Sequence, residues 1–84
     1  MKIALVSTEK VVQLETPAGT VPARIWQGET VDGIPVHAYI TRIVPEVPTS
    51  DPDIDAKTAA FESDLQRCAD PRPAVQAIPL RMVL

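Results

Sequence analysis

The dipeptide Asp32-Gly33 limits the possible folds of this chain more than any other feature of its sequence. It lies between two runs, 21–28 and 34–44, in which side chains of different character alternate. Asp-Gly between two alternating runs is typical of a tight hairpin turn, because glycine readily adopts the positive φ that such turns require. The sequence therefore predicts two antiparallel strands joined at this point.

A two-residue turn would determine which side chains share a face of this hairpin. It would place Ile25 opposite Ile40 and Trp26 opposite Tyr39, and a register shift of two residues would keep the same sorting. One face then carries aliphatic side chains and is predicted to belong to the core. The opposite face is the predicted binding face, and its members are Arg24, Trp26, His37, Tyr39 and Thr41.

The other elements follow from shorter patterns. Strands are predicted at 2–6, 11–15 and 77–84, with polar residues 7–10 as a turn between the first two. A helix is predicted over 53–68, with the apolar stripe Ile54, Phe61, Leu65 and Cys68. The predicted fold is α+β in a single domain, 1–84. It is a small curled antiparallel sheet of four to five strands, a β-meander followed by one helix packed against it and a C-terminal strand.

Few residues offer catalytic or redox chemistry. The single cysteine, Cys68, excludes an intrachain disulfide, which favours a reducing cytoplasm, and its place on the apolar stripe predicts a buried, inert thiol. The single histidine, His37, has no partner at metal-ligand spacing, and no glycine-rich phosphate loop is present. We therefore expect no enzyme, no metal and no cofactor. No run of about 20 apolar residues predicts a membrane span.

The acidic residues after the proline-rich linker resemble a calcium loop in spacing. Asp51, Asp53, Asp55 and Glu62 fall at positions 1, 3, 5 and 12 of such a loop. Position 6 is Ala56, where the loop needs glycine, so an acidic helix N-terminus is the favoured interpretation and a cation site is the alternative.

Several stretches together are similar to small uncharacterised proteins encoded in bacteriophage and prophage genomes. They are 21–30, 33–43, the pair Phe61 and Leu65, and the closing 80–84. The resemblance implies an accessory phage product that acts inside a bacterial host. It assigns no activity and no functional residue.

The predicted function is a small protein-interaction module that uses the binding face. Exposed Trp, Tyr and Arg side chains are enriched at binding hot spots, and the partner is expected to be another protein or a second copy of the chain. One alternative is a single-stranded nucleic-acid binder, since aromatic side chains also stack bases. The net charge of −3 disfavours it. A second alternative is a structural or oligomerisation protein, in which the helix or a second copy covers the same face.

Overall fold

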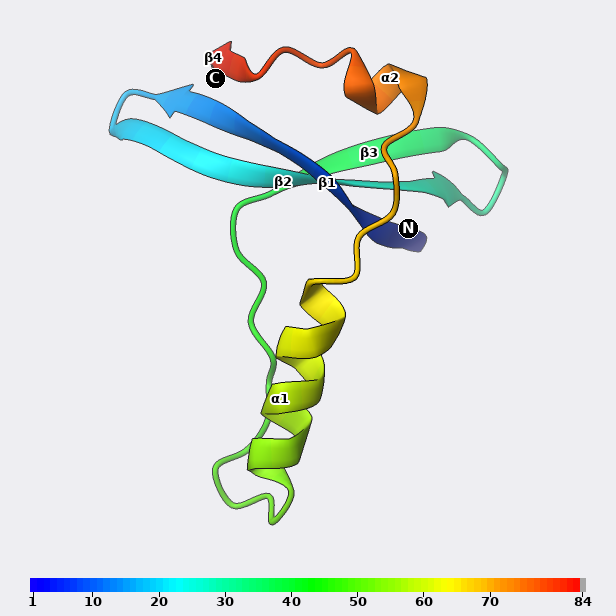
Figure 1. Cartoon of the computed structure of the whole chain (residues 1–84). Coiled ribbons are helices and arrows are strands. Elements are labelled where there is room, and N and C mark those ends of the chain that lie inside the picture. Colours follow the sequence, from blue (N-terminus) through cyan, green and yellow to red (C-terminus); the bar gives the residue numbers. More distant parts are fainter. Residues whose placement is uncertain (84) are drawn as a thin grey trace.

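The computed structural model describes residues 1–83, and over that range the chain forms a curled four-stranded sheet and two helices (Figure 1). In chain order the elements are β1 (Ile3–Thr16), β2 (Gly19–Thr30), β3 (Pro35–Ile40), α1 (Ile54–Leu65), α2 (Pro73–Gln76) and β4 (Arg81–Val83). The strand order is β3-β2-β1-β4. The coarse prediction of a small mixed fold with a curled sheet is confirmed. Several details differ: β4 pairs parallel to β1, α2 was not predicted, and further differences are described below.

The N-terminal region is one long strand and not the two predicted strands. The register between β1 and β2 shifts between Ser7 and Val11, so the polar residues predicted as a turn form a bulge inside β1. Thr8 in this bulge is fully buried, and its hydroxyl donates to the Ile25 carbonyl at 2.6 Å. A polar side chain that finds a partner in the core does not end a strand.

The hairpin between β2 and β3 is present, but its turn is one residue longer than predicted. Glu29 pairs with Pro35, and the Thr30 backbone N–H donates to the Ile34 carbonyl at 2.9 Å, which leaves residues 31–33 as the loop. Gly33 adopts a φ of 79° in it. A three-residue loop with glycine in the left-handed region is a common hairpin connection. The extra residue moves the register by one.

The predicted cross-strand pairs are therefore wrong. Ile25 lies opposite Tyr39, and Trp26 lies opposite Ala38. Because side chains alternate along a strand, a shift of one residue transfers every β3 side chain to the other face of the sheet.

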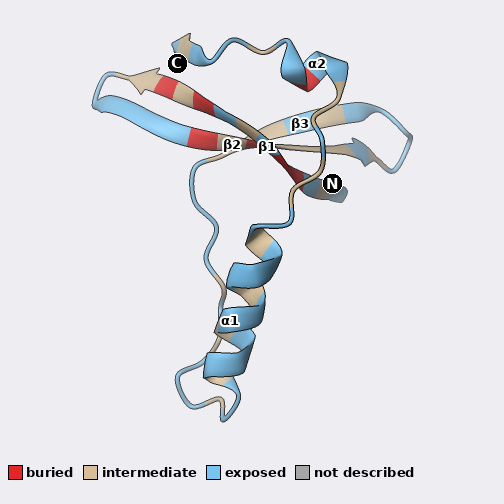
Figure 2. Cartoon of the chain, in the orientation of Figure 1, coloured by how far each residue is buried: buried red, intermediate tan, exposed pale blue. Residues whose placement is uncertain are grey.

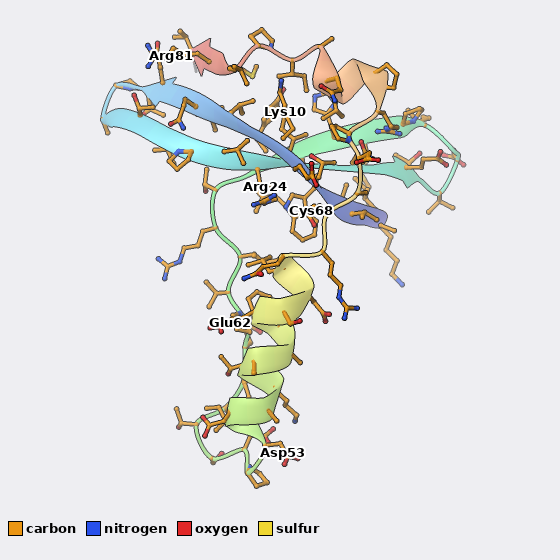
Figure 3. All side chains as sticks on the ribbon, viewed as in Figure 1. Lys10, Arg24, Asp53, Glu62, Cys68 and Arg81 are labelled. Atoms are coloured by element: carbon orange, nitrogen blue, oxygen red, sulfur yellow. The ribbon has the colours of Figure 1, made fainter. Side chains whose placement is uncertain are left out.

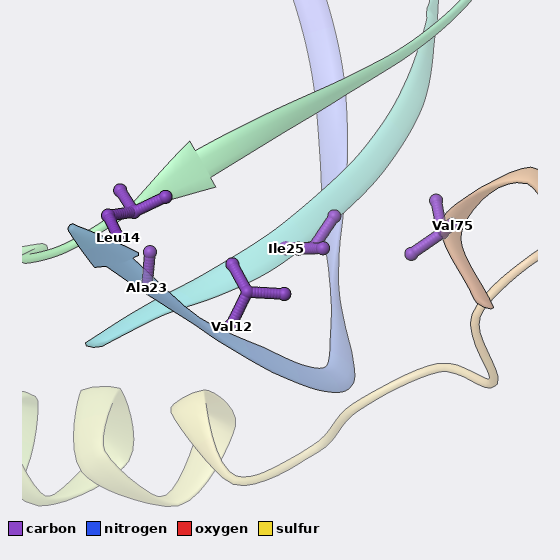
Figure 4. Packing of buried hydrophobic residues seen from close by; sticks show 5 residues of the cluster. All are labelled: Val12, Leu14, Ala23, Ile25 and Val75. Atoms are coloured by element: carbon purple, nitrogen blue, oxygen red, sulfur yellow. The ribbon is translucent and has the colours of Figure 1, made fainter. Parts of the chain in front are cut away.

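The two faces of the sheet have different coverings. The core face carries Val12, Leu14, Ala23 and Ile25, which pack with Val75 of α2 (Figure 4). Three partly buried side chains complete this cluster: Tyr39, Ile78 and Met82. The opposite face, which we call the arm face, carries Val11, Arg24, Trp26 and Ile40.

The segment after α1 crosses from the arm face to the core face. The Gln27 side-chain amide donates to the Asp70 carbonyl at 3.0 Å and accepts from the Arg72 backbone N–H at 2.9 Å. The Arg72 guanidinium donates to the Val36 carbonyl at 2.9 Å. The C-terminal strand, predicted over 77–84, is observed only over Arg81–Val83: residues 77–80 are not part of a strand, and residue 84 lies outside the described range.

Residues 41–68 form a projecting arm, which consists of a linker and α1. The arm extends from the side of the sheet opposite α2, and the linker runs beside the helix (Figure 1). The helix is shorter than predicted, and none of its described residues is buried (Figure 2). It projects from the sheet and does not lie against it, contrary to expectation. The Cα radius of gyration is accordingly 15.1 Å, whereas about 12 Å is typical of a compact domain of this length.

Candidate functional site

The structure does not bring the predicted binding face together. Arg24 and Trp26 lie on the arm face, whereas His37 and Tyr39 lie on the core face because of the shifted register. Tyr39 packs against the core cluster, and its hydroxyl lies 3.3 Å from the His37 Nε2. Thr41 follows the end of β3, at the base of the arm. The predicted residues therefore belong to two separate environments.

A hollow on the arm face is the candidate site. It has a volume of about 370 Å³ and lies where the arm leaves the sheet. Its lining comes from β1, β2, the end of β3, the linker and the last residue of α1, namely Val11, Pro22, Ala23, Arg24, Trp26, Ile40, Thr41, Arg42, Ile43 and Leu65. Three predicted binding residues, Arg24, Trp26 and Thr41, are among them. The linker residues were missed because no periodicity in the sequence relates them to the sheet.

The chemical character of the hollow is apolar and basic. Trp26 lies on β2 and Leu65 on α1, and both are half-buried. Arg24 and Arg42 supply two guanidinium groups, and none of the described lining residues is acidic. Such a lining favours a ligand that combines apolar groups with negative charge.

Contacts at the base of the arm hold the hollow in shape (Figure 3). The Arg24 Nη1 donates to the Thr8 carbonyl at 2.8 Å and lies 3.2 Å from the Cys68 Sγ. The Ser7 hydroxyl donates to the Arg67 carbonyl at 3.2 Å. Cys68 is half-buried, where full burial was predicted. These contacts join the end of the arm to the bulge of β1.

The acidic residues that resemble a calcium loop are spread along the arm: Figure 3 shows Asp53 at its far end and Glu62 nearer the sheet. The Asp51 carboxylate accepts hydrogen bonds from the Lys57 ammonium and from the Asp53 backbone N–H. The lysine is the larger cause and the backbone N–H the second, and together they lower the pKa of Asp51 from its usual 3.8. Within residues 1–83 no three His, Cys, Asp or Glu side chains are arranged to hold a metal ion.

Charge is distributed unevenly between the arm and the sheet. Residues 51–70 carry six acidic and two basic side chains, a net charge of −4. Because the whole chain carries −3, the remaining residues carry +1. The arm is therefore acidic, and the hollow at its base is basic.

Comparison with known proteins gives no relative to which this chain can be assigned. No protein-family model, no curated protein and no solved structure matches it. The resemblance to phage-encoded proteins stays a prediction. In the described part of the chain, no helix is long and apolar enough to cross a membrane.

Proposed function

We propose that this chain is a protein-interaction module that binds an acidic, apolar protein segment in the hollow on the arm face. The observation that carries the proposal is the lining of the hollow, which combines Trp26 and aliphatic side chains with Arg24 and Arg42. Tryptophan and arginine in a sheltered site are the residue types that most often dominate binding energy. Opposite charge selects among apolar partners, because a basic segment would leave like charges together.

The proposal makes the chain a binding protein and not an enzyme. His37 is the one histidine of the sequence, and it lies on the core face, away from the hollow. General acid–base chemistry needs a proton-transferring group within hydrogen-bond reach of the bound molecule. Recognition by apolar contact and charge needs no such group.

Single-stranded nucleic acid is the second candidate ligand, and the same hollow favours it. The Trp26 ring could stack on a base while Arg24 and Arg42 contact phosphates. The acidic arm beside the hollow opposes this candidate more strongly than an acidic peptide, because a nucleic acid carries a negative charge at every nucleotide and a peptide only at some residues.

Trp26 provides the test, because it is the one tryptophan of the chain and it lines the hollow. Its fluorescence would be followed during titration with a helical Glu/Leu peptide, a Lys/Leu peptide of equal length, and oligothymidylate. We expect the Glu/Leu peptide alone to shift the emission to the blue. Arg42→Glu should weaken that binding about tenfold or more, since it places like charges together. Lys2→Glu, an equal charge change outside the hollow, should leave it unchanged.

The other outcomes discriminate between the candidates. A response to oligothymidylate that falls steeply with salt would support nucleic-acid binding instead. For protein that light scattering shows to be monomeric, an emission spectrum unchanged by all three ligands would contradict both functions.

A further inference from the structure

The chain exposes more surface than a folded monomer of its size should. Its accessible surface area is 6237 Å², whereas about 4,900 Å² is typical of a monomer of 9.1 kDa. The excess is about 1,300 Å², and a stable complex of standard size covers about 800 Å² of each partner. The arm is the main source of this excess, since its surface is exposed along most of its length (Figure 2). A partner of that size would cover only part of the excess, whereas each copy in an obligate homodimer buries about 1,000–2,500 Å², which is enough.

The arm has the composition of the segment that the hollow is expected to bind. Half-exposed Ile54 and Phe61 share one face of α1, and the linker carries exposed Val44. The acidic side chains Asp53 and Asp55 lie at the far end of the arm and are exposed. The arm thus offers both the apolar groups and the negative charge.

Charge is also polarised along the arm. Its far end carries Asp51, Asp53 and Asp55 against Lys57, a net charge of −2. The end nearer the sheet carries Arg42 and Arg67 against Glu62 and Asp64, and with the adjoining Arg24 its net charge is +1. Two arms that lie side by side in opposite directions would place the acidic end of each beside the arginines at the base of the other. Arms that lie in the same direction would place like charges together.

The fold permits this arrangement in a closed pair. The arm and the hollow lie on the same side of the sheet, so two copies with their arm faces turned toward each other can exchange contacts reciprocally. In a two-fold interface, each contact from the first copy to the second is repeated from the second to the first. Each of the two hollows then binds the arm of the other copy, so no unoccupied hollow or arm remains to bind a third copy.

We infer that the segment bound in the hollow is the far end of the arm of a second copy, so that the protein is a reciprocal homodimer of antiparallel arms. This inference rests on the proposed function of the hollow and names its partner. The Trp26 and Arg42 side chains of each copy receive the Asp53 and Asp55 end of the other.

The first test is the solution mass by light scattering. The wild-type chain should have twice its mass of 9.1 kDa. Arg42→Glu, which alters the hollow, and the double variant Asp53→Lys/Asp55→Lys, which alters the arm, should each raise the dimer dissociation constant about tenfold or more. The Asp53 side chain accepts no capping hydrogen bond from α1, and circular dichroism would verify that the helix persists in the double variant.

Mixing these two variants gives the decisive result. In a mixed pair, the acidic hollow of the Arg42→Glu copy meets the basic arm end of the double variant, and the other hollow and arm end are both native. Both contacts are then complementary, so the dimer mass should return, and a misfolded variant could not give this rescue. A wild-type dimer that neither variant weakens would overturn the inference, because its interface would lie elsewhere. A monomer whose Trp26 still responds to the Glu/Leu peptide would overturn it too but keep the proposed function, and a monomer without that response contradicts both.

Discussion

At the scale of single residues, the buried hydroxyl of Thr8 has the largest effect on the sheet. It donates to the Ile25 carbonyl and accepts from the Lys10 backbone N–H at 3.2 Å. Both contacts lie inside the bulge, where backbone groups of β1 and β2 cannot pair regularly. The side chain therefore supplies hydrogen bonds that the interrupted ladder lacks, and it allows β1 to continue as one strand.

Replacement of Thr8 by valine should destabilise the fold by about 1–3 kcal/mol, because it leaves a buried carbonyl without its donor while the shape is kept. Urea unfolding followed by far-UV circular dichroism would measure the change. Thr8→Ser is the matched control, since it keeps both hydrogen bonds and loses only a methyl group. A valine variant as stable as the wild type would show that the carbonyl does not need this donor.

At the scale of elements, the hairpin shows how far sequence reasoning extends. Asp32-Gly33 correctly located the turn, because glycine is required where φ is positive. The register could not be predicted, because both faces of β3 carry apolar side chains, such as Tyr39 on one and Ile40 on the other. Alternation specifies register only where one face is clearly polar. Because the predicted register was wrong, His37 and Tyr39 were assigned to the same face as Arg24 and Trp26, whereas they lie on the opposite one.

The short helix α2 was missed for a different reason. Four residues are too few to show a helical period, and Pro71 and Pro73 are typical of the chain after a helix has ended. Proline at the first helical position is favourable, however, because its missing N–H would have had no partner there. Val75 on this helix is fully buried over the core face, so a segment without sequence signal closes the core.

We expect Val75→Ala to cost about 2 kcal/mol, since it removes buried methyl groups and leaves a cavity. The exposed neighbour supplies the control, and Gln76→Ala should change stability by less than about 0.5 kcal/mol. Thermal and urea unfolding of both variants would give the comparison. Equal stability of the two variants would mean that α2 does not contribute to the core.

At the scale of the whole molecule, the projecting shape of the arm separates its acidic end from the basic groups near the sheet. The sheet forms a folded body, and the arm extends the principal dimensions to 43 × 36 × 24 Å. The far end of the arm has a net charge of −2, and the end near the sheet, with Arg24, has a net charge of +1. A molecule with this shape presents opposite charges at a distance that a second copy can span.

Salt should therefore weaken self-association. The charges at both ends of the arm are largely exposed, and at 1 M salt the screening length falls to about 3 Å. Sedimentation velocity at low and high sodium chloride should show a dissociation constant that rises with salt. The urea midpoint of the Arg42→Glu variant, measured at the same two salt concentrations, is the control that shows whether salt changes the stability of the fold itself. A dimer strengthened by salt would indicate an interface governed by apolar contact alone.

The separation of the arm from the core has an evolutionary consequence. No side chain of residues 43–64 belongs to the described core cluster, whose members come from the four strands, α2 and the segment that follows it. Mutations in this stretch should therefore be removed by selection for stable folding less often than mutations in the sheet. After a gene duplication, two daughter copies could reverse a few charges and cease to recognise each other while both continued to fold. The architecture thus allows a lineage to diversify its associations without first acquiring a new scaffold.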